Sequence, residues 1–398
     1  MLRMPHLLII TLLLTLTGCG TPQEVSQAPK KPNFIIFLVD DLGWSDGRVF
    51  GSDLYETPNI DRLAADGMRF TTGYAACTVC SPTRAAMMTG KYPGRTHVTD
   101  WIRGHQRPYA KLNVSDWTMK IEASHTTIAE ALGAAGYRTA SVGKWHLMPN
   151  GDPNMSDYVP EKHGFEVNIG GNEWGAPGSY FHPYTHPTQT SRGVGPLPPG
   201  GNPGDYLTGR LSEEAVKLIE GFGDEPFLLY FPFYSVHTPI QATEAGIEHY
   251  KPLVKEGMLH TDPVYASMVT SVDRGVGLVR AKLDEMGITD NTVIIFTGDN
   301  GGLDRDGSGR PTENRPLREG KGSAYEGGVR TPALVSWPGV TPAGSVSEEP
   351  VITVDYYPTI LDIAGVEGDA AHNAEVDGLN LVPVLRDPNA SLNREALY

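Results

Sequence analysis

The sequence predicts an α/β fold in which helices flank a large, mostly parallel central sheet. Three observations support this prediction. Short apolar runs alternate with amphipathic or alanine-rich segments along the chain, which is the order of repeated βαβ units. The runs at 34–39, 227–231 and 292–297 lack the polar alternation of a half-exposed strand, so we expect strands buried on both faces. The chain has 398 residues, enough for one large core.

Local patterns predict the other elements in chain order. One helix has Thr57 before it, Pro58 at its first position and Gly67 at its end, and these are favoured residues at a helix start and stop. Apolar periodicity predicts the rest. We expect further helices at 126–136, 205–222, 262–286 and 354–364, and further strands at 68–74, 137–142 and 334–337.

The stretch from Cys80 to Gly90 has the signals of a short helix with a reactive side chain at its start. Ser81 suits the N-cap, Pro82 the first helical position and Gly90 the C-cap. Cys80 would then lie just outside the helix N-terminus, where free backbone N–H groups favour an anion. Arg84, one turn into the helix, could reach the same anion.

Cys80 also has other interpretations. Together with Cys77 it forms a C-x-x-C pattern, which is compatible with a redox pair or half of a metal site. A cysteine before a helix can also be a small buried apolar residue without chemistry.

Polar side chains follow four of the predicted strands directly. Because the carboxyl ends of parallel strands lie at one edge of a sheet, we expect these side chains to meet there. They are Asp40, Asp41, Lys144, His146, His237, Asp299 and Asn300. Taken singly, aspartates suit a solvated loop and a histidine suits a core position. Together, the carboxylate and amide oxygens favour a hard cation such as Ca²⁺ or Mg²⁺ over zinc.

The composition restricts the possible partners. The formal net charge is −15 and no long basic run occurs, which argues against nucleic acid as a partner. An acidic chain does not attract an anionic ligand over a distance. Recognition of an anion must therefore come from a locally cationic pocket.

The N-terminus predicts export. A basic start and a short apolar run at 7–16 are typical of a signal peptide and too short for a membrane-spanning helix. Leu16-Thr17-Gly18-Cys19 resembles the bacterial lipobox, which predicts a lipoprotein signal peptide at 1–18, lipidation of Cys19 and a flexible tether through residue 32. We expect a protein of the bacterial cell envelope that is held at the membrane by its lipid anchor alone. An ordinary signal peptide is the alternative.

The motif Cys80-x-Pro82-Thr83-Arg84, followed by Thr89-Gly90 and Arg95, resembles the signature of the formylglycine-dependent, Cys-type sulfatases of the alkaline phosphatase superfamily. The resemblance implies an alkaline-phosphatase-like sandwich. It also implies oxidation of Cys80 to formylglycine (3-oxoalanine) by a formylglycine-forming or anaerobic sulfatase-maturating enzyme, acting on the unfolded chain.

The resemblance also implies the chemistry. Ca²⁺, in preference to Mg²⁺, would be held by residue 80 together with Asp40, Asp41, Asp299 and Asn300. The hydrated aldehyde would attack sulfur, with Asp299 holding its proton. The other implied catalytic roles are alkoxide stabilisation by Arg84, contact with the sulfuryl oxygens by Lys144 and Lys321, general acid by His237, and base for sulfate release by His146.

Two loop regions are candidates for substrate recognition. Residues 149–205 show no sustained periodicity, and a loop of that length in a compact domain tends to be functional. Aromatic rings can stack on sugars and cations can bind their anionic groups. The candidate substrate-binding residues are Trp101, Arg103, His105, Trp174 and His182. They favour a sulfated polysaccharide or oligosaccharide as the substrate, although each also suits an ordinary loop position.

We expect the catalytic domain to span 33–385 and the start of a small C-terminal subdomain, largely missing, at 386–398, where residues 395–398 resemble the opening of a strand. A sulfuric ester hydrolase is the preferred function. The alternatives are a phosphoester or phosphonate hydrolase on the same scaffold, a thiol oxidoreductase that uses Cys77 and Cys80, and a non-catalytic lipoprotein that binds sulfated glycans.

Overall fold

The computed structural model describes residues 30–105, 109, 111–304 and 311–398. Lys31–Tyr398 form one compact unit. The predicted signal peptide at 1–18 and Cys19 lie outside the described residues, as does most of the predicted tether. Among the helices that the structure describes, none has the length and apolar character needed to cross a bilayer.

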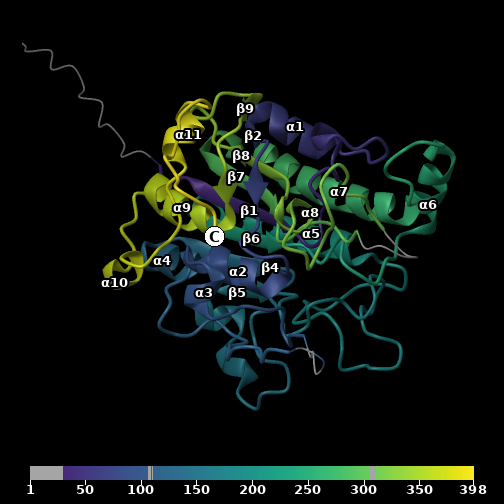
Figure 1. Cartoon of the computed structure of the whole chain (residues 1–398), viewed down its shortest axis with the longest axis horizontal. Helices are drawn as coiled ribbons and strands as arrows, with labels where there is room; N and C mark the ends of the chain where they lie inside the picture. Colours follow the sequence, from purple (N-terminus) through teal and green to yellow (C-terminus); the bar gives the residue numbers. More distant parts are fainter. Residues whose placement is uncertain (1–29, 106–108, 110, 305–310) are drawn as a thin grey trace, which may run out of the picture. The chain divides into compact units, whose positions relative to one another are not determined.

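The predicted large, mostly parallel sheet is present (Figure 1). In the described part of the chain its eight strands run in the order β5-β4-β6-β1-β7-β8-β2-β9. Only β8 is antiparallel to its neighbours β7 and β2. The strands of this sheet are β1 (Asn33–Val39), β2 (Met68–Phe70), β4 (Arg138–Val142), β5 (Val167–Ile169), β6 (Phe227–Pro232), β7 (Thr292–Gly298), β8 (Ala333–Ser336) and β9 (Ser345–Ser347). A separate parallel pair is formed by β3 (Gly73–Tyr74) and β10 (Val351–Ile352).

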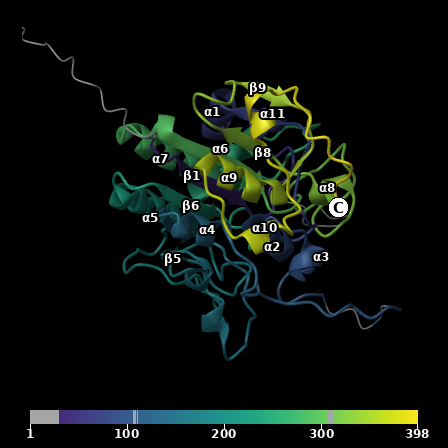
Figure 2. The ribbon, with the colours of Figure 1, turned by 90° about the vertical axis from the view of Figure 1, so that its left-hand side faces the viewer.

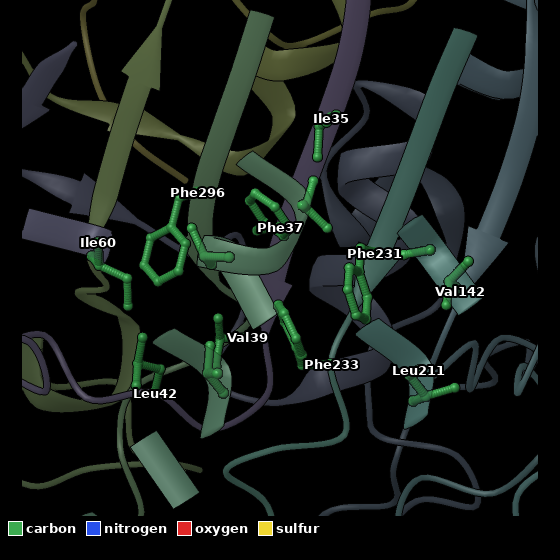
Figure 3. Packing of buried hydrophobic residues seen from close by; sticks show 14 of the residues in the cluster. Ile35, Phe37, Val39, Leu42, Ile60, Val142, Leu211, Phe231, Phe233 and Phe296 are labelled. Atoms are coloured by element: carbon green, nitrogen blue, oxygen red, sulfur yellow. The ribbon is translucent and has the colours of Figure 1, made fainter. Parts of the chain in front are cut away.

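The strand β1 is buried on both faces, as its continuous apolar sequence predicts. Ile35 and Phe37 belong to the core on one face, which Figure 3 shows around Phe231 and Phe296. Phe34, Ile36 and Leu38 belong to the core on the other face. Because side chains alternate along a strand, only a strand between two helical layers can be apolar throughout.

Helices cover both faces of the sheet, and Figure 2 shows α5 and α7 on one side of β1 and β6, with α2 and α9 on the other. The first layer contains α1 (Pro58–Asp66), α5 (Leu207–Phe222) and α7 (Pro263–Glu285). The second layer contains α2 (Cys80–Thr89), α4 (Ile128–Ala134), α9 (Tyr356–Ala364) and α11 (Val382–Arg386). The remaining short helices are α3 (Pro93–Thr96), α6 (Glu244–Tyr250), α8 (Glu326–Val329) and α10 (Ala370–Asn373).

Some predicted elements differ from the structure. The strand expected at 68–74 is divided into β2 and β3, which pair in different sheets. At Gly73 the chain passes close to β8, where a Cβ would lie 2.6 Å from that of Ala333. The long loop at 149–205 contains the edge strand β5. Residues 395–398 form no strand. The expected domain boundary at 385 stays a prediction.

Candidate active site

Cys80 lies in the first turn of α2 and is 2% exposed. The prediction that Ser81 is the N-cap is wrong, because Val79 takes that position. The Ser81 hydroxyl instead donates to the backbone carbonyl of His146 at 2.9 Å and accepts the N–H of Ile102 at 3.2 Å. Contacts between distant segments therefore use the hydroxyl that a local cap would have used, and they fix the start of α2.

The floor of the site is a group of buried, oppositely charged side chains at the ends of the central strands. Asp40 and Asp41 follow β1, and both are 1% exposed or less. Lys144, after β4, donates its Nζ to Oδ2 of Asp40 at 2.7 Å. Lys321 places its Nζ 2.6 Å from Oδ1 of Asp41 and 3.6 Å from Sγ of Cys80. The predicted meeting of strand-end side chains is thus present.

Arg84 is fully buried and binds the carboxylates of the floor rather than Cys80. Its Nε and Nη2 donate to Oδ2 of Asp299 at 2.9 and 2.8 Å. Its Nη1 donates to the carbonyl of Lys144 at 2.8 Å, and Nη2 lies 3.9 Å from Oδ1 of Asp40. Because a guanidinium has several donors in one plane, Arg84 connects Asp40 after β1 and Asp299 after β7 with the segment after β4. Its expected contact with an alkoxide stays a prediction.

A cavity of about 580 Å³ lies against this floor and has Cys80, His146, His237 and Lys321 in its lining. Four of the predicted substrate-binding residues also line it: Trp101, Arg103, His105 and Trp174. His182, the fifth, is not among its lining residues. The His182 ring instead packs edge-on against Tyr184, with ring centroids 5.5 Å apart.

A sequence model of the Sulfatase family matches residues 32–366, which includes every residue of this floor. The chain belongs to the Sulfatase family. It is a sulfuric ester hydrolase on an alkaline-phosphatase-like α/β fold.

Relatives of this sulfatase act on different substrates. N-acetylgalactosamine-6-sulfatase of Sus scrofa is 34% identical over 396 residues, which cover 96% of this chain and 69% of the relative. Steryl-sulfatase of Mus musculus is 31% identical over 448 residues, covering 95% and 68%. The crystal structure of Ps i-CgsB in complex with k-i-k-neocarrahexaose superposes with a TM-score of 0.73 at 32% identity, covering 90% of this chain and 78% of that one.

The floor of the sulfatase has the donor set for a divalent cation. Ligand atoms of Asp40, Asp41, Cys80 and His237 all lie within 4.8 Å of one another. Oδ1 of Asp40 and Oδ1 of Asn300 are shielded from solvent and have no hydrogen-bond partner. Buried oxygens of this kind are costly unless a donor or a cation meets them.

The carboxylates at the floor differ in their pKa values. Burial raises the pKa of Asp40 to about 8. The charge of Lys144 opposes this shift, and the charges of Asp299 and Asp41 add to it. Burial also opposes ionisation of Asp41, but Lys321 and then His237 hold the pKa of that carboxyl well below its usual range. A divalent cation would restore ionisation of Asp40, so the residues present fit one.

The predicted ligands have different partners in the structure. The Nδ2 of Asn300 donates to Oδ1 of Asp41 at 2.9 Å, which leaves its Oδ1 as the free amide atom. Asp299 already accepts from Arg84 with Oδ2, and its Oδ1 accepts the N–H of Asp41 at 3.2 Å. Asp299 is absent from the cluster within 4.8 Å and His237 takes part in it. The roles of Asp299 and Asn300 as ligands stay predictions.

The thiols of the C-x-x-C pattern lack the features of a redox pair. Both Cys77 and Cys80 are free. Burial raises the pKa of the Cys80 thiol to about 11, although Lys144 and Lys321 act against it, and burial also raises the pKa of Cys77. Reactive cysteines have lowered pKa values, so the unmodified Cys80 is a poor nucleophile.

Two histidines lie at the cavity with one ring nitrogen tied to the backbone. Nδ1 of His237 lies 2.8 Å from the carbonyl of Thr238, so it carries the proton, and Nε2 lies 3.6 Å from Oδ2 of Asp41. Nε2 of His146 donates to the carbonyl of Ile102, and its buried Nδ1 has no partner. Burial is the main cause that lowers the pKa of His237 to about 3, and the charge of Lys321 adds to it. Burial, together with the charge of Lys144, also lowers the pKa of His146 well below its usual value.

Sequence reasoning missed several residues of the cavity wall, namely Asn150, Glu173, Gly175 and Arg192. All four lie in the segment at 149–205, whose sequence has no periodicity that marks an inward face. Arg95, the last residue of the signature, lies outside the cavity and pairs with Asp377 at 2.7 Å.

Proposed function

We propose that this sulfatase removes sulfate from a sulfated carbohydrate, with formylglycine made from Cys80 and with a bound Ca²⁺. The main support is the buried floor, where Asp40, Asp41, Cys80 and His237 converge beside two lysines. The ion's ligands would be oxygens of Asp40, Asp41, Asp299 and Asn300 with residue 80, a hard donor set that suits Ca²⁺; Mg²⁺ is the weaker candidate.

The modification accounts for the environment of residue 80. A hydrated formylglycine would supply one hydroxyl that attacks sulfur and a second whose deprotonation releases sulfate, and Ca²⁺ would withdraw charge from the sulfuryl oxygens. The ammonium groups of Lys144 and Lys321, held in place by Asp40 and Asp41, would meet the negative charge that develops on those oxygens.

Proton transfers are divided between Lys321 and the two histidines. Lys321 is protonated, because the charge of Asp41 outweighs the effect of burial and raises its pKa. We therefore assign to Lys321 the proton for the departing sugar oxygen. His237 as general acid, the sequence-based prediction, requires its neutral ring to take up a proton first. The free Nδ1 of His146 is the base for sulfate release.

The carbohydrate substrate is supported by the cavity and by the relatives. Trp101 and Trp174 supply flat apolar surfaces in the wall, and such rings stack on sugars. N-acetylgalactosamine-6-sulfatase and the complex with k-i-k-neocarrahexaose both concern carbohydrates. Steryl-sulfatase shows that the family also includes other substrates, so the walls rather than the floor decide the substrate.

The proposal includes a processing route. Because Cys80 is buried in the folded protein, a formylglycine-forming or anaerobic sulfatase-maturating enzyme would act on the unfolded chain. The lipid anchor at Cys19 would then hold the enzyme in the bacterial envelope, where polysaccharide fragments are accessible.

Mass spectrometry of the protein made in its own host tests the proposal. We expect the peptide that contains Cys80 to be lighter than the unmodified peptide by about 18 Da, and the protein to release sulfate from sulfated oligosaccharides faster than phosphate from phosphate esters. An unmodified thiol in folded protein would contradict the mechanism. Faster phosphate or phosphonate ester hydrolysis would favour the alternative activity.

A pair of cysteine variants completes this test. Cys80→Ser should lower sulfate release by at least about 10³-fold, as loss of a nucleophile does. Cys77→Ser is the matched control and should retain the activity, because Cys77 is not among the residues that line the cavity. A thiol–disulfide exchange activity that Cys77→Ser abolishes, in a protein that releases no sulfate, would point to a thiol oxidoreductase.

A further inference from the structure

The cavity has two walls that are built in a similar way. One wall comes from Trp101 to Arg103 with His105, and the other from residues 173–176 together with Arg192. Each contributes one tryptophan and one arginine, Trp101 with Arg103 and Trp174 with Arg192. An aromatic ring next to a guanidinium can contact both the face of a sugar and an anionic group attached to it.

The wall with Arg192 is held rigidly. Trp174 donates its Nε1 to the carbonyl of Ser191 at 3.2 Å, and Asn172 donates its Nδ2 to the carbonyl of Gly193 at 2.9 Å. The guanidinium of Arg192 lies over the Trp174 ring, 5.9 Å from its centroid. Two side chains therefore fasten the backbone on either side of Arg192, and the Trp174 ring lies beside its guanidinium.

Both walls are also fixed to His146. The carbonyl of Ile102, next to Arg103, accepts from its Nε2, and the carbonyl of Asn172 accepts its backbone N–H at 3.1 Å. A Cβ at Gly175 would lie 2.4 Å from its ring. The backbone of both walls is thus held against the ring and backbone of His146 at the reacting centre.

The wall arginines differ from the cations of the floor. Lys144, Lys321 and Arg84 are paired with Asp40, Asp41 and Asp299. Within the described part of the chain, Arg192 forms no ion pair, and its Nε is shielded from solvent without a hydrogen-bond partner. Arg103 donates to an amide oxygen, Oδ1 of Asn150, at 2.9 Å, and it has no carboxylate partner among the described residues. A shielded guanidinium N–H without an acceptor is unfavourable.

We propose that the walls form a subsite for a second anionic group of the substrate, distinct from the sulfate that is removed, with Arg192 as the main contact and Arg103 as a secondary one. The group is a sulfate ester or a carboxylate on the same sugar or its neighbour. This inference rests on the proposed carbohydrate function and specifies its substrates as carbohydrates with at least two anionic groups. Glu173, in the same wall, would accept hydrogen bonds from sugar hydroxyls.

Binding to a protein without turnover tests the subsite. The full chain with Cys80→Ala is titrated calorimetrically with N-acetylgalactosamine 6-sulfate, its 4,6-disulfate, and the 6-sulfate linked to a hexuronic acid, and with the corresponding galactose series. We expect one doubly anionic ligand to bind about 10- to 100-fold more tightly than its singly charged counterpart, as a charge-assisted hydrogen bond allows. The ligand that gains affinity distinguishes a sulfate from a carboxylate.

Substitutions then show which arginine causes the preference for the doubly anionic ligand. Adding Arg192→Gln should remove most of the preference, Arg103→Gln should reduce it less, and Arg192→Lys should restore part of it. Arg62→Gln, an equal charge change at an exposed position on α1, is the matched control and should preserve the preference. Far-ultraviolet circular dichroism and thermal unfolding check that each variant is folded.

The outcomes separate the two proposals. Equal affinity for singly and doubly charged ligands, or a preference that Arg192→Gln leaves intact, would overturn the subsite while the sulfatase function remains. If none of the glycans binds, and the wild-type enzyme with formylglycine at residue 80 releases no sulfate from them, the proposed carbohydrate function is wrong. The proposed subsite is then wrong as well.

Discussion

Arg84 shows how one buried side chain can connect the parts of an active site. Its three donors connect Asp299 after β7 with the backbone of Lys144 after β4. The charge of Asp299 depends on it, because a carboxylate without a partner would be unstable at this depth. The contacts of Arg84 position the floor, and its predicted stabilisation of an alkoxide on residue 80 stays a prediction.

Replacing Arg84 by Gln tests this role. Removing one member of a buried ion pair typically lowers the free energy of unfolding by about 3–5 kcal/mol, and we expect a loss in that range by chemical denaturation. Arg95→Gln removes an exposed arginine that pairs with Asp377 and should change stability little. An Arg84 variant as stable as the wild type would contradict the role.

Removal of the metal gives a second prediction at the residue scale. Because Asp40 and Asn300 each keep a buried oxygen without a partner, treatment with EGTA should abolish sulfate release and lower the melting temperature. Adding Ca²⁺ at about 100 times its dissociation constant should restore about 2.7 kcal/mol of stability, measured by calorimetry. Restoration by Zn²⁺ but not by Ca²⁺ would show that the ligand set is different.

At the scale of elements, the site depends on the tight turns that follow the strands. Gly143 connects β4 to Lys144 with φ of +123°, and a Cβ there would lie 1.9 Å from the carbonyl oxygen of Pro232 at the end of β6. No side chain fits between the two strand ends. The glycine therefore lets Lys144 approach Asp40.

Gly143→Ala should be strongly destabilising, by about 3 kcal/mol or more, since both the backbone conformation and the contact are unfavourable. Gly136 is the matched control, because it has a φ of +83° and open space where a Cβ would lie. Gly136→Ala should lower the free energy of unfolding by about 1–2 kcal/mol, from the backbone conformation alone. Urea unfolding of both variants measures the difference. Equal losses would show that the contact with Pro232 relaxes easily.

At the scale of the whole molecule, stability comes from two cores on opposite faces of one sheet. His163 lies at the edge of the second core and its ring is 5.7 Å from that of Trp145. Burial lowers the pKa of His163 to about 4, from 6.5. Below about pH 6.5 the unfolded chain binds a proton at His163 that the folded protein binds only near pH 4, so the unfolded state is favoured as the pH falls through this range.

We therefore expect His163 to contribute up to about 3 kcal/mol to the loss of stability between pH 6.5 and 4. In His163→Leu the free energy of unfolding should fall less steeply over this range. His249→Leu, which removes an exposed histidine paired with Glu56, is the control. Identical pH profiles for His163→Leu and the wild type, measured by urea unfolding, would contradict the prediction.

Predictions that depend on the pattern within one segment are confirmed more often than predictions that depend on which side chains meet in the folded protein. Apolar runs such as 34–39 and 292–297 predicted central strands because burial on both faces requires that composition. The polar pairs after them predicted the site because parallel strands end at one edge. Local rules predict that Ser81 is a cap, but a contact with the distant His146 uses its hydroxyl instead. His182 is predicted to line the substrate pocket, but its ring packs against Tyr184 two residues on.

By itself, the sequence determined the fold class, the sulfatase family and the side chains that form the floor, since these depend on periodicity, on strand ends and on one local motif. Only the tertiary structure decided which charges pair, which ring nitrogens remain free and which residues form the walls. The physical reason is that Arg84 and Asp299, 215 positions apart, and Trp174 and Arg192, in a segment without periodicity, become neighbours only when the strands and loops pack. Local sequence contains no record of such contacts.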